Sequence, residues 1–422
     1  MATSRFRQFV LASGLTNLAD GVATVAWAWL ASLLTRDPFL ITLVPMALRL
    51  PWFLCAIPAG IITDRVDRRV LILRMDALRA IAFLFATVAI YMALPLDTPP
   101  QSGVSDPALF SIIAAAAALV GVAEVFRDNA AQTVLPSIVP HDDLEKANGR
   151  LWSVELVGNA LIGPALGAFL ISFALPLPFL VNFIAYLIAI ALVLRLTGSF
   201  RPATKDVKNW RSELAEALRF LKQAPLLRSL AWITGFWNLF FHLVLVGLVL
   251  HVQENLNLGA RAYGLILAAG ALGGIAGGWC AEPIVRRLGQ QRAAQWMLMA
   301  SPPAFLAIAF APGPVSLGLT LAIFEFTGLV WNTVSVSYRQ RTIPDELLGR
   351  VNSIYRLLAW GMIPVGLLLY GVIVSFFENF TLRETALTIP FFVSSAGSLI
   401  LGMFGWRALS GGFLRANHTV AR

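Results

Sequence analysis

Long apolar runs alternate with short polar interruptions along the whole chain. A helix needs about 20 mostly apolar residues to cross a bilayer, and twelve runs meet this length. Their approximate bounds are 8–34, 39–63, 70–94, 107–133, 148–174, 177–196, 226–252, 260–283, 293–311, 315–340, 352–376 and 386–408. The pattern therefore predicts an all-α membrane protein with twelve transmembrane helices.

The sharpest interruption is Gly60–Arg69, which reads GIITDRVDRR and places five charges within six residues. It lies between two apolar runs of membrane length. Charges of this density are costly inside hydrocarbon, so the segment is expected to form a short hairpin at the membrane surface.

Composition supports the membrane class. Hydrophobic residues make up 58% of the chain and charged residues only 13%, about half the ~25% charged residues of a soluble domain. The net charge of +9 fits basic loops at a membrane face better than a nucleic-acid partner. Cys55 and Cys280 both lie in apolar runs and predict no disulfide framework.

Basic residues predict the orientation. With the amino terminus inside, the outer loops hold only Arg36, Arg261 and Arg383 of the 32 basic residues. The positive-inside rule then places both termini in the cytoplasm. We expect a multi-pass protein of the inner membrane of a bacterium. The run that follows Arg5 and Arg7 is too long for a cleaved signal peptide and is expected to be the first helix.

An internal repeat predicts two six-helix halves. Pro140–Asn148 and Pro344–Asn352 share proline, acid, leucine, basic residue and asparagine in register, 204 positions apart. The halves span 1–196 and 226–422, joined by a cytoplasmic linker at 197–225. Within the linker, Trp210–Leu221 alternates apolar and charged positions at helical spacing. It is expected to lie on the inner membrane surface as a linker helix, with a regulatory or partner site as the alternative.

These features together resemble the major facilitator superfamily, and the resemblance covers nearly the whole chain. The residues that carry it are Asp20, the motif Gly60…Asp64-Arg65…Asp67-Arg68-Arg69, Gly163-Pro164…Gly167 and Arg339…Pro344-Asp345…Arg350. Asp20, the loop motif and the Arg339…Arg350 segment together resemble the branch that contains enterobactin exporters and macrolide efflux pumps, and Gly163-Pro164…Gly167 is similar to the glycine-proline motif of the drug/proton antiporters. The resemblance implies export by alternating access, often driven by protons. Two positions depart from the family pattern, namely Asp67, where many members have glycine, and Ala168, where a second glycine is common.

Ionisable residues at membrane depth are the first functional candidates, because they are costly there. Asp20 and Arg49 lie at similar depth on antiparallel neighbouring helices and could pair. The pair could be a static contact between two helices, or it could break during transport and so allow Asp20 to take up and release a proton. Glu325 and His242 complete the set of proton-coupling candidates.

Polar stripes mark three predicted helices. Asn17, Asp20, Thr24 and Trp27 share one helix face, as do Thr234, Asn238 and His242 on a second helix and Glu325 and Asn332 on a third. The resemblance implies that helices one, four, seven and ten line a central cavity. The candidates for substrate contact are Asn17, Thr24, Trp27, Asn238, Phe241 and Asn332. Such polar residues could instead form hydrogen bonds between helices.

Charges near the cytoplasmic helix ends are expected to form an inner ion network that gates the inner mouth. Its candidate members are Gly60, Asp64, Arg65, Arg68, Arg69, Glu124, Arg127, Asp128, Glu155 and Arg356, with Arg356 contributed by the other half. A permanently solvated rim is the alternative. The segment Gly278–Gly289 is a degraded copy of the opening motif. Asp64→Ala is therefore expected to impair transport more than Glu282→Ala.

Small residues predict one tight helix contact. Gly158, Gly163, Pro164 and Gly167 place small side chains at close to four-residue steps, which allows backbones to approach. Pro164 also removes one backbone donor and could bend the helix.

The leading hypothesis is a secondary active transporter that exports a small amphipathic molecule, such as a drug or siderophore, in exchange for protons. The alternatives are a metabolite importer of the same fold, a sensor without flux and a membrane enzyme. No HExxH, Gly-x-Ser-x-Gly or Walker A motif is present. We therefore expect no enzyme activity, no cofactor and no metal, and a protein that functions as a monomer in the lipid bilayer.

Overall fold

The computed structural model describes residues 4–63, 65–139, 144–198, 200 and 210–420, and every regular element within them is a helix. Among the described residues, nine helices are long and apolar enough to cross a membrane, and the count is ten if the bent pair Leu40–Leu54 with Ala56–Thr63 forms one span. In a bilayer, helices satisfy their own backbone polar groups, which explains this architecture. The α4 helix and the α12–α13 pair are not among these spans, so the predicted count of twelve stays a prediction.

The chain divides into two compact units. The first comprises Met1–Thr204 and Val252–Ala268, and the second comprises Lys205–His251 and Ala269–Arg422. The division after residue 204 lies within the predicted linker. The short segment Val252–Ala268 groups with the first unit, although the repeat assigns it to the second half.

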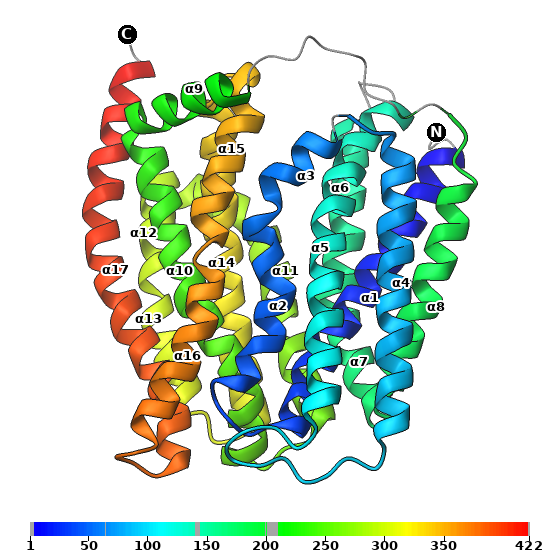
Figure 1. Ribbon diagram of the computed structural model, residues 1–422. Coiled ribbons are helices and arrows are strands. Elements are labelled where there is room, and N and C mark those ends of the chain that lie inside the picture. Colours follow the sequence, from blue (N-terminus) through cyan, green and yellow to red (C-terminus); the bar gives the residue numbers. More distant parts are fainter. Residues whose placement is uncertain (1–3, 64, 140–143, 199, 201–209, 421–422) are drawn as a thin grey trace. The chain divides into compact units, whose positions relative to one another are not determined.

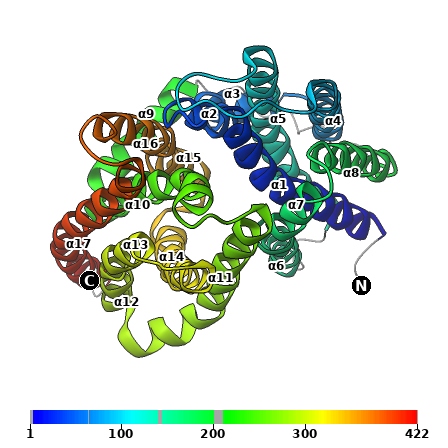
Figure 2. The same ribbon diagram turned by 90° about the horizontal axis from the view of Figure 1, so that it is seen from below.

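The first unit is a bundle in which α1 contacts α8, α7, η2 and α6, and α4 packs against α5 and α8. Figures 1 and 2 show α1 tilted relative to α4, α5 and α8. The elements are α1 (Ser4–Leu34), α2 (Leu40–Leu54), α3 (Ala56–Thr63), α4 (Arg68–Ala93), α5 (Pro107–Ile138), α6 (Leu144–Glu155), the π-helix η2 (Leu156–Ile162), α7 (Gly163–Ile171) and α8 (Leu177–Leu194).

The second unit packs α10 against α15, α16 and α17, and α14 against α12 and α13. Its elements are α9 (Trp210–Gln223), α10 (Pro225–Leu250), α12 (Gln290–Met299), α13 (Ser301–Ala309), α14 (Pro314–Thr342), α15 (Asp345–Trp360), α16 (Ile363–Phe377) and α17 (Arg383–Val420). Along the chain, the π-helix η3 (His251–Asn255) and α11 (Ala260–Leu288) each contain one boundary between the two units.

The linker helix lies across the ends of two neighbours. Figure 1 shows α9 running over the ends of α10 and α15. Its apolar residues Ala217 and Leu221 are buried with Leu227, Val351 and Ile354. The α9 helix therefore packs its apolar side onto the second unit, as expected for an amphipathic helix.

Local sequence explains where several helices begin and bend. Asp67 caps α4 by accepting hydrogen bonds from the backbone N–H groups of Arg69 and Val70, at 3.0 and 3.2 Å. This is the position where many family members have glycine. The α2 helix contains Pro45 and Pro51 and meets α3 at an angle of 54°, because proline removes backbone hydrogen bonds within a helix.

One expected loop is helical instead. The degraded copy at Gly278–Gly289 was expected to connect a span that ends near residue 283 to one that begins near residue 293. The α11 helix instead continues through Pro283 to Leu288. Gly289, with a φ of 77°, is the single residue between α11 and α12. The left-handed backbone favours glycine there, so the turn lies at the end of the motif rather than within it.

Candidate functional site

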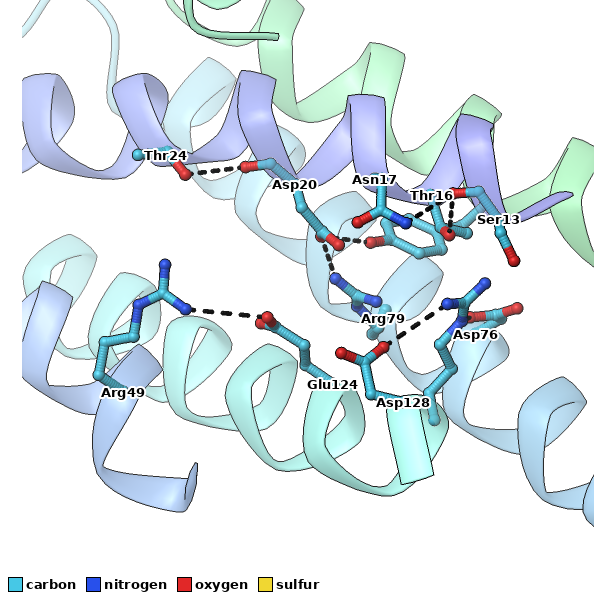
Figure 3. A network of polar contacts seen from close by, with 12 residues as sticks. Ser13, Thr16, Asn17, Asp20, Thr24, Arg49, Asp76, Arg79, Glu124 and Asp128 are labelled. Carbon is cyan, nitrogen blue, oxygen red and sulfur yellow. Dashed lines mark hydrogen bonds and ion pairs between the residues drawn. The ribbon is translucent and has the colours of Figure 1, made fainter. Parts of the chain in front are cut away.

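The centre of the first unit holds a buried ion pair between α1 and α4. The Arg79 guanidinium is fully buried and pairs with the Asp20 carboxylate, whose side chain is 17% exposed. The Tyr186 hydroxyl on α8 donates to the same carboxylate oxygen at 2.7 Å. Arg79 also lies over the Tyr186 ring, 4.5 Å from its centroid. Three helices therefore hold one carboxylate, as Figure 3 shows for Asp20 and Arg79.

The expected pairing of Asp20 with Arg49 is wrong, because each residue has another partner. Arg49 lies 3.8 Å from the Glu124 carboxylate on α5. The α2 and α5 backbones approach closely at Leu48 and Gly121, where an added methyl group would lie 2.9 Å from the Leu48 carbonyl carbon. The close approach of α2 to α5 at Leu48 is next to Arg49, whose side chain lies beside Glu124 of α5 rather than Asp20 of α1.

A second buried cluster joins α4 to α5. The Asp76 carboxylate is fully buried and lies 3.5 Å from the Arg127 guanidinium, which is 3.6 Å from Asp128. Asp76 is three residues before Arg79 on α4, so the two clusters share one helix. Arg127 and Asp128 were both expected in the inner ion network, and they form an ion pair with each other; Asp76, the second partner of Arg127, was not among the expected members.

Sequence reasoning missed Asp76, Arg79 and Tyr186. The two charges are three residues apart within the apolar run 70–94, and the rule that singled out Asp20 applies equally to them. Tyr186 carries no charge, and nothing in its local sequence marks it. Only the packing of α8 against α1 and α4 reveals its contact.

The paired arrangement has a clear electrostatic cause. A charge buried without a partner costs several kcal/mol, so arginine and carboxylate at membrane depth occur together. Such pairs can hold a helix bundle in one arrangement, and neutralising one member releases the other. Among the described residues, no group of three or more His, Cys, Asp and Glu side chains could hold a metal ion.

The charged loop stabilises helix ends within the first unit. Arg68 donates to the Thr133 carbonyl on α5 at 2.9 Å, and Arg69 donates through Nε to the Val193 carbonyl on α8 at 3.1 Å. Basic side chains at the last carbonyls of a helix are favourable. Two other expected members of the network, Arg65 and Gly60, lie at the surface of the unit. Arg65 is exposed, and a methyl group added to Gly60 would have no neighbour within 4 Å.

The gating hypothesis stays a prediction. Asp64 lies outside the described residues. Glu155 is exposed on α6, and Arg356 lies over the Trp360 ring on α15, 4.3 Å from its centroid. Arg356 belongs to the second unit, and its expected contact across the halves is not tested by these observations.

The second unit contains a network of hydroxyl groups between α10, α14 and α15. The Tyr355 hydroxyl lies 3.0 Å from that of Thr234 and 2.8 Å from that of Ser335. The Trp331 indole donates to Thr234 at 3.2 Å. Arg339 lies over the Tyr355 ring, 3.8 Å from its centroid. The expected polar stripe on α10 is therefore used partly for contacts between helices.

The remaining α10 candidates also make helix contacts. Asn238 donates to the Ala359 carbonyl on α15 at 2.9 Å. His242 Nδ1 lies 2.9 Å from the Asn238 carbonyl, and its ring stands edge-on to that of Phe241. Phe241 itself stacks with Trp237 and with Phe324. These residues stay candidates for substrate contact because each is partly exposed.

Glu325 and Asn332 lie on α14. Asn332 is exposed. Glu325 packs towards α11, where its Cγ would lie 3.5 Å from a methyl group added to Gly270. Its carboxylate has no ion pair among the described residues. The structure thus leaves Glu325 as a partly exposed acid beside a glycine-rich helix face.

One substrate candidate is corrected. Trp27 is only 2% exposed and packs against Phe83 and Phe179, with ring centroids 5.7 and 4.8 Å away. It belongs to the core of the first unit and is not available to a ligand. Asn17 and Thr24 on the same helix are partly exposed, and each donates to a backbone carbonyl of α1, those of Ser13 and Asp20.

The glycine motif lies where α7 and η2 meet α1. A methyl group added to Gly163 would lie 2.5 Å from Gly21 Cα, and one added to Gly167 would lie 2.6 Å from the Val22 carbonyl oxygen. Gly158 faces Leu18 in the same way, at 3.1 Å from its backbone nitrogen. The π-helix η2 precedes Pro164, and its wider turn accommodates the missing proline donor. This contact fixes the helix that carries Asp20.

Comparisons with known proteins agree with this architecture. The chain matches the family described as transmembrane secretion effector over residues 1–405. It is 25% identical to the multidrug efflux pump Tap of Mycolicibacterium fortuitum over 86% of this chain and 87% of the relative. It is 26% identical to the pump of the same name from Mycobacterium tuberculosis, over 86% and 85%.

Solved structures show the same fold. A bacterial homologue of the iron transporter ferroportin, in its inward-facing state, has a TM-score of 0.73 at 19% identity, over 96% of this chain and 98% of that one. A bacterial homologue of the human lysosomal transporter Spinster has a TM-score of 0.73 at 16% identity, over 97% of both chains. The chain is a multi-pass membrane transporter and belongs to the transmembrane secretion effector family of the major facilitator superfamily.

Proposed function

We propose that this protein is a secondary active transporter that exports small amphipathic molecules in exchange for protons. The observation that carries the proposal is the group of paired charges at membrane depth in the first unit, where Asp20 pairs with Arg79 and Glu124 lies 3.8 Å from Arg49. A buried carboxylate whose partner can be withdrawn is suited to take up and release a proton.

Export of drug-like molecules is supported by the relatives. Both are named multidrug efflux pumps, and each alignment covers about 85% or more of both chains. Partly exposed aromatic and polar residues of the second unit, such as Phe241 and Asn238, suit an amphipathic substrate. The solved structures in the comparison support the fold alone, because their identity to this chain is 19% or lower.

The proposal includes the membrane in which the protein lies and its oligomeric state. The bias of basic residues supports a bacterial inner-membrane protein with both termini in the cytoplasm. We infer that the chain functions as a monomer. Size-exclusion chromatography with light scattering tests this inference, and a stable dimer that alone carries substrate would contradict it.

Transport by purified protein tests the function directly. The protein is reconstituted into lipid vesicles with ethidium as the probe, and its movement is followed with and without an imposed pH gradient. We expect ethidium to move against its gradient only when the pH gradient is present. Asp20→Asn should lose this movement, because Arg79 then lacks its charged partner. Movement of ethidium that ignores the pH gradient would contradict proton antiport, and binding without movement would indicate a sensor.

A further inference from the structure

The carboxylates of the first unit differ in the ion pairs and hydrogen bonds that protonation would weaken. Asp20 accepts hydrogen bonds from Arg79 and Tyr186. A neutral Asp20 would leave the fully buried Arg79 guanidinium without its ion-pair partner. Removing one member of a buried pair is strongly unfavourable. These contacts favour a structural role for the Asp20 carboxylate.

Asp76 is also poorly placed for proton exchange. Its side chain is fully buried, and its described ion pair is with Arg127, which is 5% exposed. Because the carboxylate has no exposed surface, a proton has no direct route from solvent. A neutral Asp76 would also weaken the charge balance around the buried Arg127.

Glu124 differs from both in its partner, and unlike Asp76 it is not fully buried. Its side chain is 13% exposed, and its described ion pair is a 3.8 Å approach to Arg49, which is 38% exposed. No hydrogen bond to its carboxylate occurs among the described residues. When Glu124 takes a proton, the charge left behind is on the partly exposed Arg49 guanidinium, which costs less than an unpaired charge on the fully buried Arg79 would.

The backbone around Glu124 allows its partner to move. Arg49 lies between Pro45 and Pro51 on α2, and α2 meets α3 at an angle of 54°. Proline weakens the hydrogen-bond ladder of a helix, so α2 is easier to bend than its neighbours. At Gly121, one turn before Glu124, α5 contacts the α2 backbone at Leu48. A bend of α2 there would separate Arg49 from Glu124.

We propose that Glu124, rather than Asp20, holds the proton exchanged in each transport cycle, with Arg49 as its displaceable counter-ion. This inference rests on the proposed proton antiport. Asp20 then anchors Arg79 and keeps the bundle in register. The charged side chains that act on Glu124 are Asp20 on α1, Arg49 on α2, Arg79 on α4 and Asp128 on α5. Asp76, Arg127 and Tyr186 belong to the adjoining buried contacts, and α6, which packs on α5, carries Arg150 and Glu155.

Infrared spectroscopy tests the proton site without any substrate. Difference spectra of the purified protein are recorded between buffers on the two sides of neutral pH, where exposed carboxylates stay ionised. We expect the C=O band of a protonated carboxyl group to appear on the acidic side in the natural protein. Glu124→Gln should lose the band, whereas Asp20→Asn and the loop variant Asp97→Asn should keep it. A band that persists in Glu124→Gln would overturn the proposal.

Transport distinguishes this inference from the proposed function. In vesicles with equal pH on both sides, Glu124→Gln should carry ethidium down its gradient at the natural rate, while the acceleration by a pH gradient is lost. Glu124→Asp should recover part of the acceleration, and Asp97→Asn should behave as the natural protein. If the natural protein responds to the pH gradient and Glu124→Gln responds equally, the proton site is wrong. If the natural protein carries ethidium without any response, antiport itself is wrong.

Discussion

Arg79 on α4 lies fully buried against the Asp20 carboxylate on α1, and Tyr186 on α8 donates to the same oxygen. The pair thus ties together three helices that are distant in sequence. It also shows that α4 contributes two buried charges, Asp76 and Arg79, that sequence reasoning did not single out. The following expectations test this pair and the contacts that support it.

Removing one partner of the pair should be costly. Arg79→Met leaves Asp20 with Tyr186 alone, and the loss of a partner from a buried ion pair costs about 3–5 kcal/mol. Thermal unfolding in detergent, followed by size-exclusion chromatography, measures the change. The double variant Asp20→Leu with Arg79→Met should recover part of the loss, since it leaves no unpaired charge.

Arg49→Met provides the matched control for that experiment. Its partner distance is 3.8 Å and its side chain is 38% exposed, so its removal should cost only about 0–1 kcal/mol. An equal loss of stability in Arg49→Met and Arg79→Met would contradict the ranking of the two pairs.

The cap of α4 should respond to the size and chemistry of residue 67. Asp67→Ala removes the acceptor for two backbone N–H groups and should destabilise the protein by about 1 kcal/mol. Asp67→Gly should cost only a few tenths of a kcal/mol, and Asp67→Ser should retain most of the cap. Thermal stability of the three variants checks the order, which would be wrong if serine were no better than alanine.

Close packing of α7 on α1 should make Gly163 intolerant of larger side chains. Gly163→Val places two methyl groups against Gly21, where even one has no room. Overpacking typically costs about 1–3 kcal/mol, and here it would also displace the helix that carries Asp20. The yield of monodisperse protein and the transport rate should both fall. Gly60→Ala is the control, because its methyl group meets no neighbour within 4 Å.

The Tyr355 ring should contribute more than its hydroxyl to holding Arg339. Tyr355→Phe keeps the ring beneath the guanidinium and removes the contacts with Thr234 and Ser335. Tyr355→Leu also removes the cation–π contact, which is worth about 0.5–2 kcal/mol. Leucine should therefore lower thermal stability more than phenylalanine does. Equal effects would assign the contribution to the hydroxyl network instead.

The sequence by itself determined the elements of this fold. Because a bilayer offers no water to backbone groups, each long apolar run must satisfy its own hydrogen bonds as a helix. Helix therefore occupies every predicted run, and the amphipathic segment beginning at Trp210 is α9. The costs of charge at membrane depth also marked Asp20 correctly as a residue with a buried partner.

Only the tertiary structure decided which partner each charge has. Asp20 and Arg49 have suitable depths, but depth does not fix how each helix is rotated about its axis. The close approach of α2 and α5 at Gly121 faces Arg49 towards Glu124, and the packing of α1 against α8 brings Asp20 to Tyr186. Side-chain partners depend on these rotations and helix contacts, which involve residues far apart in the sequence.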